Sequence, residues 1–349
     1  MRTFDYTSYR TKSWDTEIVN CLSAIHEARG KQTYYLRQKE ETLTRLTEIA
    51  KIQSTESSNA IEGIRTTETR LRQLIAEKTA PRNRDEREIL GYRDALNAVH
   101  ESFEYIPLTP NYILQLHKIM FRYTGSSFGG QYKNVQNYIT ASDSSGKRYI
   151  LFQPPAPYET APAVQAACDA YNLAVGEGVV DPLLLIPLFV HDFLCIHPFL
   201  DGNGRMSRLL TTLLLYRSGY TVGKYISLEA KIAETKDDYY EALEKSQHGW
   251  REGKDDPTEF IRYILKIILE AYRDLEDRME ILEGKKNALE IVREAVHQQI
   301  GLFRKKDILE RCPSLSTASV ERSLRAMCEG GEIEKQGSGR ATSYVRKTI

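Results

Sequence analysis

The residue types best suited to chemistry lie close together between positions 197 and 208, which read His-Pro-Phe-Leu-Asp-Gly-Asn-Gly-Arg-Met-Ser-Arg. An apolar helix is predicted to end at His197, because Pro198 lacks the amide hydrogen needed for simple continuation. A new amphipathic helix is predicted to begin near Gly204, since four leucines follow at helical spacing (Leu209, Leu210, Leu213 and Leu214).

The turn Gly202-Asn203-Gly204 therefore lies at the N-terminus of a predicted helix. Free amide hydrogens and the helix dipole make such an end an anion site, and glycine lets a phosphate approach closely. Arg205 and Arg208 are three positions apart, so they share one helix face. Two guanidinium groups there suit a di- or triphosphate.

His197 and Asp201 supply the remaining chemistry. An imidazole that titrates near neutral pH can act as a general base toward an attacking hydroxyl. A carboxylate offers the hard oxygen ligand that suits Mg²⁺ bridging phosphates. A base, a cation ligand, an anion site and two arginines together predict phosphoryl or nucleotidyl transfer.

The stretch resembles the H-P-F-x-D/E-G-N-G-R-x-x-R signature of the Fic family, and every defined position is matched. The similarity is expected to extend from about residue 14 to 280. The resemblance implies a mainly helical domain. It also implies transfer of AMP from ATP onto a Ser, Thr or Tyr hydroxyl of a protein, because most characterised members do this.

The resemblance also implies individual roles. His197 would deprotonate the target hydroxyl, Asp201 would hold Mg²⁺, and Phe199 would anchor the loop in the core. The remaining positions of the signature would bind the nucleotide, with Arg208 nearest the γ-phosphate (Gly202, Asn203, Gly204, Arg205, Met206, Ser207 and Arg208).

A second motif, Ser58-Asn-Ala-Ile-Glu62-Gly63, resembles the S/T-x-x-x-E-G/N inhibitory motif of many Fic proteins. Ser58 and Glu62 are four positions apart and share a helix face, while Gly63 suits a helix C-terminus. The resemblance implies that Glu62 pairs with Arg208 and displaces the γ-phosphate, and it implies an N-terminal inhibitory helix over about 43–63.

Several other positions also have counterparts in the family. The segment 137–152 is predicted to form a β-hairpin, which is either a flap that clamps the target or a structural hairpin. Lys133 replaces the usual arginine of a G-x-Y/F-R element. Tyr239 and Tyr240 are either neighbours of the adenine or core aromatics, and Gln247 is a candidate for contact with the nucleotide.

Helical patterns dominate the elements that must position these residues, and the fold class is mainly α with one small hairpin. We expect an N-terminal helical region over 1–103 with a break near Gly30, a Fic-type catalytic core over 104–280, and a winged helix-turn-helix over 285–349. The last rests on helices predicted at 285–299, 305–311 and 317–329, followed by two strands flanking Gly337-Ser-Gly339.

Composition restricts the class of protein further. The chain carries 48 basic and 48 acidic residues, so its net charge indicates no acidic partner, although residues 285–349 hold 13 Lys and Arg against 8 Asp and Glu. Five scattered cysteines indicate neither a zinc site nor a disulfide framework. No apolar signal segment or membrane span is apparent, and a cytoplasmic location is expected.

Three functions remain open from the sequence. The first is a self-inhibited protein adenylyltransferase that uses ATP and Mg²⁺. The second is the same site removing AMP from a modified protein. The third is a winged-helix DNA-binding regulator with a nucleotide-sensing domain. The expected partner is a protein with a hydroxyl side chain, with the chain itself as one candidate, and a homodimer is also left open.

Overall fold

The computed structural model describes residues 2–35, 40–142, 148–282, 288–299, 301–312, 315, 317–337 and 342–347. The chain divides into two compact units. The first comprises Met1–His26 with Ala50–Ala271, and the second comprises Glu27–Ile49 with Tyr272–Ile349. The predicted site residues all belong to the first unit.

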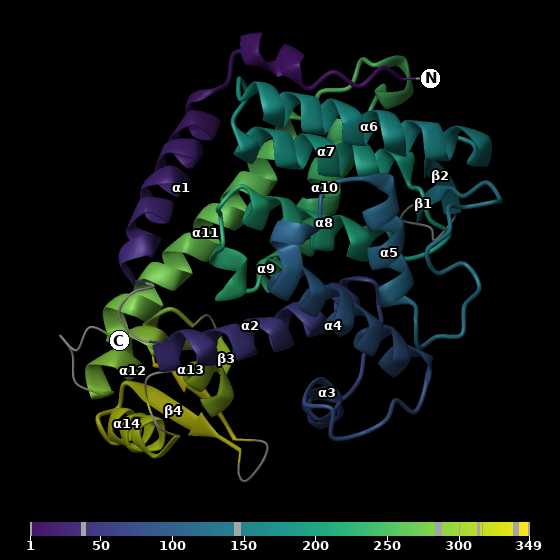
Figure 1. Ribbon diagram of the computed structural model, residues 1–349. Coiled ribbons are helices and arrows are strands. Elements are labelled where there is room, and N and C mark those ends of the chain that lie inside the picture. Colours follow the sequence, from purple (N-terminus) through teal and green to yellow (C-terminus); the bar gives the residue numbers. More distant parts are fainter. Residues whose placement is uncertain are drawn as a thin grey trace. The chain divides into compact units, whose positions relative to one another are not determined.

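The described residues are mainly helical, as predicted (Figure 1). The α-helices are α1 (Thr16–Tyr35), α2 (Glu40–Ile61), α3 (Glu68–Ile75), α4 (Arg84–Ser102), α5 (Pro110–Met120), α6 (Pro157–Glu177), α7 (Pro182–Ile196), α8 (Asn203–Arg217), α9 (Leu228–Glu234), α10 (Lys236–Gln247), α11 (Thr258–Leu282), α12 (Ala288–His297), α13 (Lys305–Arg311) and α14 (Thr317–Glu329). Short 3₁₀ helices lie at Thr7–Thr11, Phe103–Tyr105, Val222–Lys224 and Trp250–Glu252.

Helix α7 is the centre of the first unit. It begins at Pro182, a residue favoured at the first helical position, with the Asp181 side chain accepting a hydrogen bond from the Leu183 amide. Every residue from Leu183 to Ile196 is buried, as expected for a helix that is apolar on all sides. Helix α7 packs against α6 and α8, and it lies beside α6 in Figure 1. The core therefore fixes the helix that ends at the 197–208 stretch.

Helices α4 and α5 pack against each other at very short range. A side chain on Gly91 in α4 would collide with the carbonyl oxygen of Met120 at the end of α5. Glycine is required there because the two backbones approach too closely for a Cβ. Helix α4 also packs on α8, so this close contact helps to position the helix that carries both arginines.

The predicted hairpin is present. Strands β1 (Ile139–Ser142) and β2 (Arg148–Phe152) pair antiparallel, with Thr140 opposite Ile150 and a register shift next to Ile139. The turn at 143–147 lies outside the described residues.

The second unit contains the C-terminal helices α12, α13 and α14 and three antiparallel strands. The strands are β3 (Leu302–Phe303), β4 (Ile333–Gln336) and β5 (Ser343–Arg346), in the sheet order β3-β5-β4. Val292, Ile308, Val320 and Leu324 belong to its buried core. The three helices and the strands β4 and β5 match the predicted elements, whereas β3 was not predicted. The winged-helix interpretation itself stays a prediction, and residues 338–340 at its tip lie outside the described residues.

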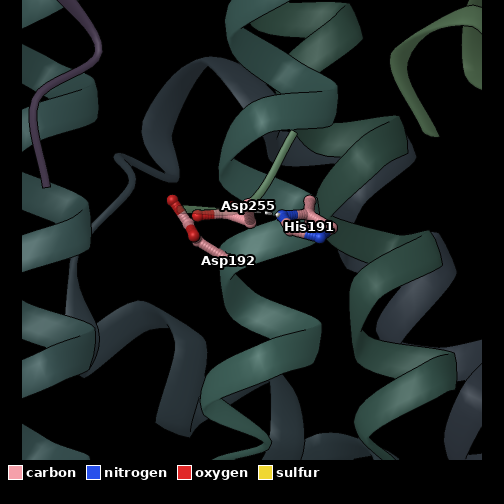
Figure 2. Close-up of side chains that lie close together, drawn as sticks. All are labelled: His191, Asp192 and Asp255. Atoms are coloured by element: carbon pink, nitrogen blue, oxygen red, sulfur yellow. Dashed lines mark ion pairs between the residues drawn. The ribbon is translucent and has the colours of Figure 1, made fainter. Parts of the chain in front are cut away.

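The side chains of His191, Asp192 and Asp255 form a buried charged cluster (Figure 2). His191, Asp192 and Asp255 place one ligand atom each within 4.8 Å of one another. The Arg2 guanidinium pairs with both carboxylates, and Asp192 also accepts hydrogen bonds from Tyr6 and Trp250. Because an arginine already compensates the two acids, we regard this cluster as structural rather than as a cation site.

One sequence-based expectation was wrong, and one helix was not predicted. The helix break predicted near Gly30 does not occur there, because α1 continues through Gly30 to Tyr35. A solvent-exposed glycine costs a helix only about 1 kcal/mol relative to alanine, and neighbouring turns supply the remaining stability. Helix α9 was not predicted, although Ser227 caps it by accepting a hydrogen bond from the Ala230 amide.

Candidate active site

His197 is the C-cap of α7 and adopts a left-handed conformation with φ 48° and ψ 60°. This conformation is costly for a residue with a side chain and persists only when its surroundings hold it. The Asn137 side-chain amide donates to the carbonyl oxygens of His197 and Phe199, at 3.1 and 3.0 Å. Lys133 donates from its ammonium group to the Ile196 carbonyl and from its amide to the Pro198 carbonyl. The residues just before and within the hairpin segment therefore brace the turn.

The protonation state of His197 suits a general base. Its Nδ1 lies 3.2 Å from the Leu194 carbonyl oxygen, which can only accept, so Nδ1 carries the proton and Nε2 has a free lone pair. Burial, with a smaller contribution from the positive charge of Lys133, lowers the pKa of His197 to about 4, although the Leu194 carbonyl and Glu62 oppose this. The imidazole is therefore neutral at neutral pH.

Phe199 and Asn203 hold the turn from inside. Phe199 is fully buried and stacks on His117, with ring centroids 3.7 Å apart, which confirms its predicted place in the core. The Asn203 side chain accepts from the Phe199 amide and donates to the Phe199 carbonyl. The Asn203 side chain thus stabilises the turn, whereas its backbone forms the first residue of α8.

The N-terminus of α8 is shaped for an anion. Gly202, its N-cap, has φ 83°, and a side chain there would collide with Met120 and Phe121. A Cβ on Gly204 would collide with a carboxylate oxygen of Glu62 and would lie 3.3 Å from the Arg208 guanidinium. The Glu62 carboxylate therefore lies against the first turn of α8, where backbone amides and the helix dipole favour negative charge.

Arg208 is held in this arrangement by three hydrogen bonds. Its Nε donates to the Ser58 hydroxyl, and one Nη donates to both the Ser58 carbonyl and the Glu62 carboxylate, each at 2.8 Å. Burial alone would raise the pKa of Glu62, but Arg208, with Arg205 and Lys236, outweighs burial and lowers it. Helix α2 ends one residue before Glu62, and Gly63 follows with φ 81°.

Asp201 and Arg205 lie beside this anion site. Arg205 has a 1% exposed side chain, whereas the Asp201 side chain is 40% exposed and reachable from solvent. Mg²⁺ usually keeps several waters and binds one or two carboxylates together with substrate phosphates. A single exposed carboxylate next to a helix N-terminus fits that requirement, so Asp201 is a suitable ligand for the cation.

The other residues that were predicted to contact the nucleotide differ in how exposed they are. The side chains of Met206 and Ser207 are buried, and Ser207 bonds to the Gly204 carbonyl. Tyr239 is buried among Phe260 and Tyr263, whereas Tyr240 is 42% exposed. Gln247 lines a groove of about 350 Å³ between β2 and the end of α10. Roles for these side chains toward a nucleotide stay predictions.

Sequence reasoning missed the supporting residues Asn137 and Glu88. Asn137 was noticed only as part of a strand, and its side-chain contacts with the turn lie 60 and 62 positions away. Glu88, which is buried and pairs with Arg205 at 2.8 Å, gave no local signal, because its partner lies 117 positions away.

This geometry defines a helical domain whose signature loop joins a buried imidazole to a glycine-lined helix N-terminus. Residues 107–215 match the profile of the Fic/DOC family. The chain therefore carries a Fic domain, and the resemblance drawn from the signature is confirmed.

Known proteins support the same assignment. A protein adenylyltransferase Fic of Nematostella vectensis is 26% identical over 264 residues, which are 74% of this chain and 55% of that protein. One of Drosophila willistoni is 30% identical over 203 residues, covering 57% of this chain and 36% of that protein. The chain thus spans between 36% and 55% of the length of these two relatives.

Solved structures share the fold. A Fic family protein of Desulfovibrio desulfuricans G20 has a TM-score of 0.62 and 20% identity, covering 97% of this chain and 98% of its own. Fic-1 of C. elegans has a TM-score of 0.61 and 21% identity, covering 75% and 73%. The mainly α, Fic-type fold class is confirmed.

In the part of the chain that the structure describes, no helix is both long and apolar enough to traverse a bilayer.

Proposed function

We propose that this chain is a self-inhibited protein adenylyltransferase that moves AMP from ATP, with Mg²⁺, onto a Ser, Thr or Tyr hydroxyl of a protein. One observation carries the proposal. The Glu62 carboxylate lies against Gly204 and pairs with Arg208, so an internal anion fills the place where the signature would receive a phosphate. The two adenylyltransferases reported above share the sequence similarity and support AMP as the group transferred.

The chemistry follows from the free Nε2 of His197. This nitrogen accepts the proton of the target hydroxyl as the oxygen attacks the α-phosphorus. The new bond joins the hydroxyl oxygen to the α-phosphorus, and the bond from that phosphorus to the α,β-bridging oxygen breaks. Pyrophosphate leaves with the bonding electrons. The amides at the start of α8 and the Arg208 guanidinium stabilise the charge on the phosphates.

Asp201 is the residue that would hold Mg²⁺. When bound, the cation would neutralise part of the charge on the phosphates and orient them.

Self-inhibition follows from competition for Arg208. A γ-phosphate and the Glu62 carboxylate both require this guanidinium, and they cannot occupy the start of α8 together. Glu62 is 31% exposed at its side chain, so it can leave without unfolding the core.

The target would reach His197 beside the hairpin. Tyr149 and Ile150 on β2 are about half exposed, which leaves apolar surface for an extended segment of a partner. Main-chain pairing with a strand edge is a common mode of peptide binding. We infer that a protein segment, from another protein or from this chain, binds there.

The other functions have less support. Removal of AMP would use the same residues, but the two relatives are named for its transfer. Binding of DNA through the C-terminal unit, a homodimer and a cytoplasmic location stay predictions.

The decisive experiment compares four proteins incubated with Mg²⁺ and ATP labelled at the α-phosphate: wild type, Glu62→Gly, His197→Ala and the double variant. Mass spectrometry would locate labelled AMP on the chain or on proteins of a lysate. Glu62→Gly is expected to incorporate much more label than wild type, and His197→Ala should abolish this incorporation. Equal labelling of Glu62→Gly and wild type would refute self-inhibition, and labelling independent of His197 would refute the proposed activity. AMP released from a pre-labelled target by wild type would instead favour the reverse reaction.

A further inference from the structure

Four charged side chains form a closed ring beside the signature loop. Glu88 on α4 accepts from the Arg84 Nε at 2.7 Å and pairs with Arg205 at 2.8 Å. Asp201 completes the ring, since one of its carboxylate oxygens lies 3.4 Å from Arg84 and the other lies 3.4 Å from Arg205. Two acids and two bases make the ring neutral as a whole.

The ring runs from the interior to the surface. The Glu88 and Arg205 side chains are 3% and 1% exposed, whereas Asp201 and Arg84 are 40% and 70% exposed. A buried guanidinium needs a carboxylate partner, and Glu88 provides it. Arg205 is therefore held at a fixed orientation, with its second nitrogen directed at Asp201. The two pairs that involve Asp201 are the longest in the ring.

We propose that Glu88 is a positioning residue that directs Asp201 toward the divalent cation through Arg205, and that Arg84 occupies Asp201 until the cation replaces it. This inference rests on the proposed function, because Asp201 is the cation ligand there. The ring supplies two effects of opposite sign. The negative charge of Glu88 offsets the positive charge of Arg205 and so reduces its repulsion of a cation at Asp201. Arg84, in contrast, competes with the cation for the Asp201 carboxylate.

The opposite effects of Arg84 and Glu88 on cation binding distinguish the proposed roles from simple structural support. Removing Arg84 should make the cation bind more tightly, because a competing exposed ion pair is worth up to about 1 kcal/mol, or about fivefold. Neutralising Glu88 should weaken cation binding by about tenfold or more, since Arg205 would then carry an uncompensated charge beside Asp201. A merely structural role for both residues would impair binding in both variants.

The test uses the full chain with Glu62→Gly, so that the internal carboxylate does not compete. Mn²⁺ replaces Mg²⁺, α,β-methylene-ATP serves as a nucleotide that cannot donate AMP, and electron paramagnetic resonance measures free Mn²⁺. Arg84→Met is expected to lower the Kd of Mn²⁺ about two- to fivefold, and Glu88→Gln to raise it about tenfold. Glu88→Asp should restore part of the loss. Arg87→Met is the matched control, because Arg87 is exposed on the same helix and lies outside the ring.

An unchanged or higher Kd for Arg84→Met would overturn the proposal, whatever happens to Glu88→Gln, whose buried site risks poor folding. A normal Kd for Glu88→Gln in a protein that melts like its parent would overturn the role of Glu88. If no variant binds Mn²⁺, the cation role of Asp201 fails together with this inference. If Mn²⁺ binds as expected but Glu62→Gly transfers no AMP, the proposed function fails alone.

Discussion

Ser58→Ala should weaken self-inhibition in a graded way. The Ser58 hydroxyl accepts a hydrogen bond from the Arg208 Nε at 2.8 Å, in a fully buried position. A hydrogen bond to a charged group contributes about 1.5–3 kcal/mol. Arg208 keeps its bonds to the Ser58 carbonyl and to Glu62, so we take the lower end, which corresponds to about a tenfold change in an equilibrium. The rate of AMP incorporation should therefore rise up to about tenfold over wild type and stay below that of Glu62→Gly.

The assay is the initial rate of label incorporation from ATP, with melting temperatures measured in parallel. The informative comparison is Ser58→Ala in the Glu62→Gly background, where it should add nothing, because the arrangement that it weakens has already been lost. A rate for Ser58→Ala equal to wild type would contradict the reasoning. A tenfold slower rate in the Glu62→Gly background would show instead that Ser58 positions Arg208 for catalysis.

Three other perturbations have defined signs. Lys133→Met removes a positive charge that lowers the pKa of His197, so the acidic limb of kcat/KM for Glu62→Gly should move to higher pH; an unmoved limb would exclude this electrostatic effect. Burial lowers the pKa of His100 to about 3, so the stability that it contributes is complete above pH ~6.5 and is lost as pH falls toward ~3. At pH 5 the wild type should have lost about 2 kcal/mol of this stability. Urea titrations measure the free energy of unfolding at pH 7 and pH 5, and the difference between the two should be smaller by that amount in His100→Phe than in wild type. The same difference in both proteins would refute this role of His100. Arg2→Met leaves the two buried carboxylates of Figure 2 without their cation and should lower the free energy of unfolding by about 3 kcal/mol, whereas a loss within error of zero in urea titrations would show that the N-terminal segment does not contribute.

Much of the site could be predicted from the sequence because its elements are local. Pro198 and the leucine spacing after Gly204 indicate where α7 ends and where α8 begins, and both boundaries agree with the structure to within a residue. The pairing of Glu62 with Arg208 was predicted as well, through the resemblance of two short motifs to family patterns. Segments of a dozen residues carry this information because helix ends depend on neighbouring residues.

The remaining features depend on contacts between residues far apart in the chain. Nothing near Glu88 indicates that it faces Arg205, and nothing near Asn137 indicates that its amide supports His197. The continuity of α1 through Gly30 was missed for a different reason, because the helical residues around this exposed glycine override its weak preference. Local propensity is a weak guide wherever packing supplies most of the free energy.

The two arginines of the signature illustrate how burial divides similar side chains into different roles. Arg205 and Arg208 are both almost fully buried, yet their partners differ: Glu88 is 3% exposed, whereas Glu62 is 31% exposed. Separating a fully buried pair leaves an uncompensated charge in the core, which costs several kcal/mol, so the Arg205–Glu88 pair should persist in every state. Glu62 can exchange its contact with Arg208 for water, and a phosphate can then take its place. Under the proposed function, the carboxylate opposite each arginine would therefore determine which one is a fixed support and which one is available for regulation.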